Sequence, residues 1–115
     1  MRIQPKGHQA ARIRQRKCQL IRQYQIPEDI LPGSLSLHQT SCGKPNCRCA
    51  EGEGHPVWSL TYMAGGKKHV QHIPKHLVDE VRKRVEGGRE YQDAVREVMA
   101  ANVHLLALAR KQRLI

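Results

Sequence analysis

The stretch Cys42–Cys49, CGKPNCRC, holds three of the four cysteines of the chain and is followed by His55. Its spacing is C-x4-C-x-C-x5-H. Structural zinc sites take four Cys or His ligands in a closed tetrahedron. Gly, Pro and Asn lie between the first two cysteines and favour the tight turn that brings two sulfurs onto one ion. The stretch therefore predicts a zinc knuckle with the ligands Cys42, Cys47, Cys49 and His55.

Other readings of these cysteines stay open. Three free thiols in a surface loop, or one disulfide with a spare thiol, would give the same sequence, although Cys47 and Cys49 are too close to pair without strain. His55 is the histidine nearest to the cysteines, and a short loop keeps the closure entropy low. The alternative candidates for the fourth ligand are Cys18, His38, His69 and His72.

The composition predicts one small domain with a thin core. The chain has 115 residues, of which 39% are apolar and 3% aromatic, and such domains usually need a metal or a partner for stability. No apolar run approaches the roughly 18 residues that a membrane span requires. Clustered cysteines without a secretory leader favour a reducing compartment and a metal over disulfides. We therefore expect a cytoplasmic protein with no membrane partner.

The formal net charge of +10 indicates a polyanionic partner, most simply nucleic acid. Residues 1–27 carry seven bases and no acid, residues 28–73 carry four of each, and residues 74–115 carry nine bases and six acids. Good helix formers occupy 9–25, and Pro27 ends that helix. We expect this arm to bind phosphates through Arg12, Arg14, Arg16, Lys17 and Arg22. A solvated leader that only aids solubility is the competing interpretation.

Further basic residues are candidates for nucleic-acid contacts. Lys44 and Arg48 lie inside the cysteine stretch, and Lys67 and Lys68 lie at the tip of a predicted hairpin. A second basic cluster, Arg82-Lys83-Arg84, is expected on the outer face of the C-terminal helix.

The stretch 57–73 predicts a β-hairpin. Its first half alternates apolar and polar residues, and Gly65-Gly66 suits a two-residue turn with positive φ at both positions. Simple register pairs Tyr62 with His69. The same register pairs Trp58 with Ile73 and places Trp58, Leu60 and Tyr62 on one face, where we expect them to pack on a helix. A short extended segment is expected at 35–39, before the cysteines.

Residues 75–115 predict one long helix that starts after Pro74. Its apolar seam follows a heptad-like register through positions 81, 85, 88, 92, 95, 99, 102, 106 and 109. Because this register passes Gly87-Gly88 without a phase jump, we expect one long helix, with a bend or a break at the glycines as the alternatives. Asn102 falls on the seam, and the N-terminal helix or a second copy of the chain is expected to cover it.

These predictions combine into an α+β fold. Its parts are a basic helical arm (1–27), a zinc knuckle with a β-hairpin (28–74) and a long C-terminal helix (75–115), forming a single compact domain.

The chain resembles an uncharacterised bacterial family of short zinc-ribbon-like proteins, often encoded near transposases and mobile elements. The resemblance covers about 33–106 and rests on the C-G-K-P-x-C-x-C-A core, on His55-Pro56, on Gly65-Gly66-Lys67 and on Ile73-Pro74. Two features depart from that family: Pro56 follows His55 without an intervening Gly, and Gly87-Gly88 interrupts a helix that is usually continuous. The resemblance implies a zinc-binding accessory protein that is associated with nucleic acid.

Three classes of function follow. The first is a non-catalytic, zinc-containing protein that binds nucleic acid, DNA rather than RNA, beside a larger enzyme such as a transposase or nuclease. The second is an adaptor or inhibitor that docks through the C-terminal helix. The third, an enzyme with a zinc-bound water and Glu51 or Glu53 as base, is disfavoured because cysteine-rich ligand sets are typical of structural zinc.

Overall fold

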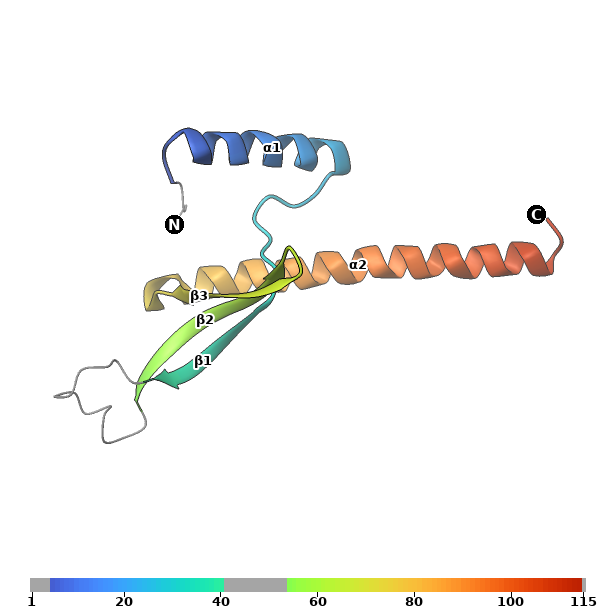
Figure 1. Ribbon diagram of the computed structural model, residues 1–115. Helices are drawn as coiled ribbons and strands as arrows, with labels where there is room; N and C mark the ends of the chain where they lie inside the picture. Colours follow the sequence, from blue (N-terminus) through green and yellow to red (C-terminus); the bar gives the residue numbers. More distant parts are fainter. Residues whose placement is uncertain (1–4, 41–53, 115) are drawn as a thin grey trace.

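Helix α1 (His8–Tyr24) opens the described part of the chain, which comprises residues 5–40 and 54–114 of a computed structural model. It ends where Gln25 adopts a left-handed conformation, φ 54°, two residues before Pro27. A linker then leads to the sheet and to helix α2 (Val78–Lys111), as Figure 1 shows. The α+β class and the two predicted helices are thus confirmed.

Three antiparallel strands form the sheet in the order β1-β2-β3: β1 (Ser34–Thr40), β2 (His55–Ala64) and β3 (Lys67–Ile73). The predicted hairpin register is confirmed, because Tyr62 pairs with His69. The pairing of Trp58 with Ile73 is confirmed as well.

The turn of the hairpin also follows the prediction. Gly65 has φ 60° and Gly66 has φ 77°, a backbone region that side chains with a Cβ rarely occupy. Two consecutive positive φ angles match the right-handed twist of the two strands that the turn joins.

Strand β1 is more than the short extended segment that the sequence predicted. It pairs with β2 along its whole length, so that Leu35 lies opposite Leu60 and Leu37 opposite Trp58. The two-stranded ribbon is therefore corrected to a three-stranded sheet. The added strand extends the apolar face that packs against α2, and three strands with such a face are far more stable than an isolated hairpin.

The core lies between this face and the first part of α2. Leu60, Val81 and Val85 are buried at its centre. The partly buried side chains around them are Leu31, Leu35, Tyr62, Ile73 and Leu77. This cluster is small, so much of the molecule projects from it: the radius of gyration is 20.7 Å, against about 13 Å for a compact chain of this length.

Helix α2 runs through Gly87-Gly88 without a break. The expectation of one continuous helix is confirmed, and the glycines have a packing role. A Cβ at position 88 would overlap the carbonyl oxygen of Leu31, where the linker crosses the helix. The Leu31 N–H donates a 3.0 Å hydrogen bond to the carbonyl of Arg84, one turn earlier in α2. Gly88 thus lets the linker backbone lie directly on the helix.

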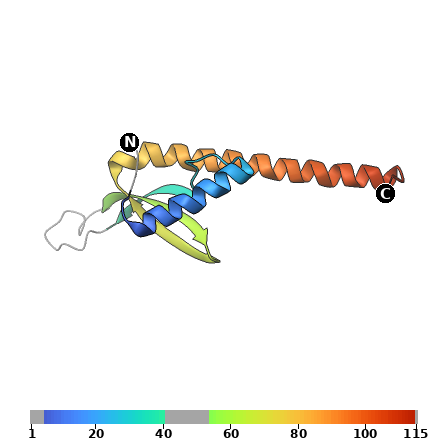
Figure 2. The same ribbon diagram turned by 90° about the horizontal axis from the view of Figure 1, so that it is seen from above.

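Figure 2 shows the molecule from above, with the C-terminal part of α2 standing clear of the sheet and of α1. Neither helix of the described residues combines the length and the apolarity that crossing a bilayer requires.

The two adjacent glycines give a matched test of this crossing. Gly88→Ala is expected to lower the free energy of unfolding by about 1–3 kcal/mol, because the new methyl group forces the linker off α2. Gly87→Ala meets only Ile30, at 3.7 Å, and is expected to stabilise the helix by up to about 1 kcal/mol. Urea unfolding of both variants measures the difference, and equal effects would contradict the proposed role of Gly88.

Candidate metal centre and nucleic-acid interface

The cysteine stretch is closed at its base by a strand pair. Thr40, the last residue of β1, lies opposite His55, the first residue of β2, and such partners have Cα atoms about 4.5–5.5 Å apart. The chain therefore leaves the sheet and returns to it at one point. The predicted ligands Cys42, Cys47 and Cys49, together with Lys44 and Arg48, lie outside the described residues.

The sheet register separates the candidates for the fourth ligand by distance along β2. His55 lies at the base itself, and His38 pairs with Val57, two residues further on. At about 3.3 Å per residue, His38 lies roughly 7 Å from the base. His72 pairs with Ser59 and lies about 13 Å away. The register therefore favours His55.

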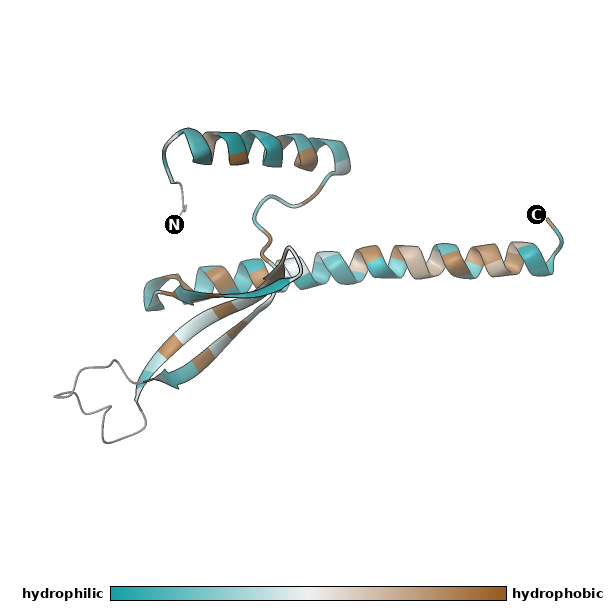
Figure 3. Cartoon of the chain, in the orientation of Figure 1, coloured by the Kyte–Doolittle hydropathy of each residue, from teal (hydrophilic) through white to brown (hydrophobic). Residues whose placement is uncertain are grey.

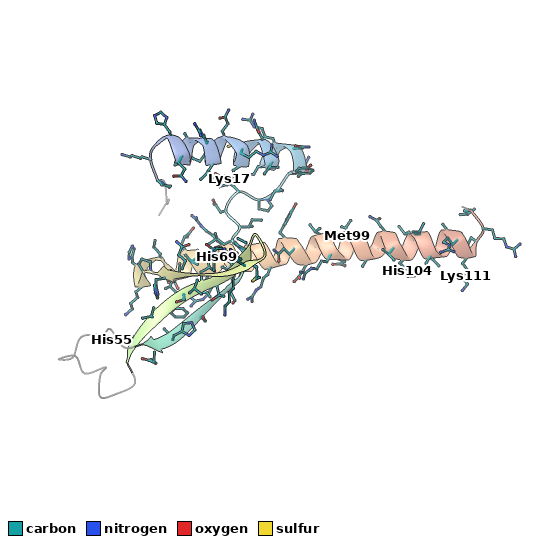
Figure 4. The ribbon with its side chains drawn as sticks, in the orientation of Figure 1. Lys17, His55, His69, Met99, His104 and Lys111 are labelled. Atoms are coloured by element: carbon teal, nitrogen blue, oxygen red, sulfur yellow. The ribbon has the colours of Figure 1, made fainter. Side chains whose placement is uncertain are left out.

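The two remaining candidates are poorly placed. His69 pairs with Tyr62, about 23 Å along β2 from the base. Its ring stacks on the Tyr62 ring with centroids 5.3 Å apart. Figure 4 labels His55 and His69 at clearly separate positions. Cys18 is exposed on α1, outside the sheet.

Within residues 5–40 and 54–114, no three Cys, His, Asp or Glu side chains form a group able to hold a metal ion. The predicted set relies on the three cysteines together with His55. Three thiolates and one imidazole are the donor types that structural zinc takes, so the residues present fit that metal chemically.

Helix α1 presents its charge without burying any residue. Its five basic side chains are exposed, and in the part of the chain that the structure describes none of them forms an ion pair. Arg14 donates to the carbonyl of Pro5 at 2.7 Å, and Arg16 to the side-chain oxygen of Gln19 at 3.3 Å. Both acceptors are neutral, so neither contact compensates the positive charge of its arginine.

One side of α1 faces acidic residues of the linker. A hollow of about 440 Å³ is lined by Arg14 and Lys17 of α1, by Glu28 and Asp29 of the linker and by Arg84 of α2, among others. No ion pair joins these acids to the bases of α1 among the described residues, and the acids are not among the functional residues predicted above. Their position in the sequence, directly after Pro27, could have indicated that they lie close to the basic helix.

The chain belongs to the family described as Domain of unknown function (DUF6788). The match covers residues 10–83 and so takes in almost all of α1, the cysteine stretch, the sheet and the start of α2. The matched range begins and ends earlier in the chain than the resemblance described above, which covers about 33–106. Comparisons with curated proteins and with solved structures find no match.

The second basic cluster, at the end of the DUF6788 match, needs correction. Arg82 pairs with Asp79 at 3.0 Å and lies over the Trp58 ring, 5.4 Å from its centroid. Arg84 pairs with Glu80 at 3.1 Å, and its side chain is only 17% exposed. Two of the three charges are therefore compensated locally.

The hairpin-tip bases of the DUF6788 fold are exposed and lie at the end of the sheet opposite to Thr40 and His55. Lys67 and Lys68 follow the turn at the far end of β2. The ten residues of β2 span about 30 Å between the tip and the base where the cysteines attach. Lys67 and Lys68 thus lie far from the point at which the chain leaves and re-enters the sheet, and Lys44 and Arg48 lie outside the described residues.

Proposed function

We propose that this DUF6788 protein is a non-catalytic, zinc-containing accessory protein that binds nucleic acid. One observation carries the proposal: α1 is a helix with five bases, no acid and no buried residue, and its bases have no ion-pair partner among the described residues. A helix that contributes nothing to the core and keeps its charge free is suited to contacts with phosphates.

The dimensions of α1 favour duplex DNA over RNA. The 17 residues of α1 span about 26 Å at 1.5 Å per residue. A helix with side chains is about 10–12 Å across, and the major groove of DNA, about 12 Å wide, admits it. The corresponding groove of an RNA helix is deep and narrow. Basic side chains around α1 would then reach phosphates on both sides of the groove.

Zinc has a structural role in this proposal. Cys42, Cys47, Cys49 and His55 would hold the ion and fix the cysteine stretch on the end of the sheet. Four protein ligands close the coordination sphere and leave no position for a reacting water, which is why the proposed role is non-catalytic. We place the protein in the cytoplasm, because thiolates stay available to a metal in a reducing compartment.

Lys44 and Arg48, inside the cysteine stretch, and Lys67 and Lys68, at the hairpin tip, are proposed as additional nucleic-acid contacts. Lys67 and Lys68 lie at the end of β2 away from the point where the chain leaves and re-enters the sheet, so they would act separately from the cysteine stretch. The family resemblance further supports a larger partner enzyme, such as a transposase or nuclease. The second candidate, an adaptor or inhibitor that docks through α2, is favoured by the exposed apolar residues of its C-terminal half.

Metal analysis tests the zinc site. The purified chain is expected to contain about one zinc per molecule. Changing Cys42, Cys47, Cys49 or His55 to Ala is expected to reduce the zinc content and to lower the melting temperature. Cys18→Ser and His38→Ala remove the same side-chain types from exposed positions outside the predicted set and are expected to keep the metal. A wild-type chain that contains no zinc would refute the site.

Salt dependence tests the role of α1. The triple change of Arg12, Arg14 and Arg16 to Gln is expected to weaken binding to a DNA duplex. It should also reduce the slope of log K against log salt by about 0.9 for every phosphate that the variant no longer neutralises. The control changes Arg89, Arg96 and Lys111 of α2 to Gln and removes the same charge. Equal weakening in the two triple variants, measured by fluorescence anisotropy, would show that net charge and not α1 binds the DNA.

A further inference from the structure

The C-terminal part of α2, residues 89–111, carries apolar side chains that nothing in the described structure covers. Val98 is 61% exposed, Met99 55% and Leu106 53%. Figure 1 shows this part of the helix standing clear of the sheet and of α1, and Figure 3 shows hydrophobic residues along it. A helix without tertiary contacts has little to stabilise it in water, so these side chains indicate a missing partner surface.

These side chains form one stripe along the helix. At 100° per residue they fall within about 60° on either side of Asn102. The stripe consists of Val95, Val98, Met99, Asn102, Leu105, Leu106 and Ala109. Val81 and Gly88, which the sheet and the linker cover, fall within the same limits, so the stripe continues that side of α2.

We propose that the stripe binds the same stripe of a second copy of the chain, with the two helices antiparallel and a two-fold axis at Asn102. Because the pairing is centred on Asn102, the numbers of two facing residues add up to 204. Val95 then lies opposite Ala109, Met99 opposite Leu105, and Asn102 opposite its own copy. Each apolar position of the stripe meets an apolar position, and the two amides hydrogen-bond to each other at the one polar position.

The linker decides the orientation of the second helix. Leu31 lies on the covered side of α2 at Gly88, so that side is blocked from Gly88 towards the N-terminus. An antiparallel partner does not reach the blocked region. Its own helix ends at Lys111, opposite Asp93, five residues short of the crossing. A parallel partner would bring two linkers and two sheets into the same space.

The charges along α2 favour the same orientation. Residues 90–97 carry three acids and one base, whereas residues 107–114 carry three bases and no acid. Antiparallel pairing puts these oppositely charged segments at the same level, on axes about 8–10 Å apart. It also keeps the two basic α1 helices at opposite ends of the dimer. A second copy brings acids beside Arg110 and Lys111, whereas the α1 of the same chain would bring only bases there.

Adjacent residues of α2 supply the test. In sedimentation velocity, the wild-type chain is expected to have the mass of a dimer. Leu106→Glu places a charge in the stripe and is expected to give a monomer, whereas Ala107→Glu places the same charge about 100° away, off the stripe, and is expected to leave the dimer intact. A monomeric wild-type chain, or the same loss of dimer in both variants, would overturn the proposal.

Photo-cross-linking tests the orientation independently of any folding defect. With p-benzoylphenylalanine in place of Val95, the antiparallel dimer is expected to cross-link to the peptide around Ala109 of the second copy. Cross-links to the peptide around Val95 itself would show a parallel pair and overturn the proposed register. Neither experiment depends on zinc or nucleic acid, so this inference and the proposed function can fail separately.

Discussion

The passage of the linker across α2 is the contact on which the rest of the fold depends. Leu31 donates its backbone N–H to the Arg84 carbonyl, and its own carbonyl lies against Gly88, where any side chain would intrude. The crossing leads the chain into β1, whose leucines complete the apolar face over Val81 and Val85. It also closes the core at one end, and beyond it α2 has no neighbour among the described residues.

Sequence pattern predicted the local parts of this fold well. Alternation and Gly65-Gly66 fixed the β2–β3 register, and the unbroken heptad phase predicted a continuous α2. The pairing of β1 with β2 could not be predicted in the same way, because fourteen residues separate Thr40 from His55 and no turn motif sets the register. The packing role of Gly88 could not be predicted either, because its partner Leu31 is far away in the sequence.

Charge was predictable as a total but not in its distribution. The seven bases of the first 27 residues correctly indicated an exposed basic helix. The Arg82–Arg84 cluster did not stay free, although Asp79 and Glu80 stand three and four residues before their partners, at the spacing where helical side chains meet. A basic run read together with its i−3 and i−4 neighbours would have indicated this compensation. For the proposed metal site, the sequence supplies the types of the predicted ligands, and the strand register supplies the position of His55.

The linker is held against the rest of the fold at two nearby residues, Leu31 and Gly33. These two contacts determine how α1 can turn. Gly33, with φ 85°, lies against the Thr61 carbonyl, just as Leu31 lies against Gly88. Any reorientation of α1 must therefore be taken up by residues 25–30. For a rod about 26 Å long, a swing of about 30° at that pivot displaces the free end by roughly 13 Å, close to the width of a DNA major groove. A small change in a few backbone torsions is thus enough to displace the free end of α1 by about the width of such a groove while the core keeps its packing.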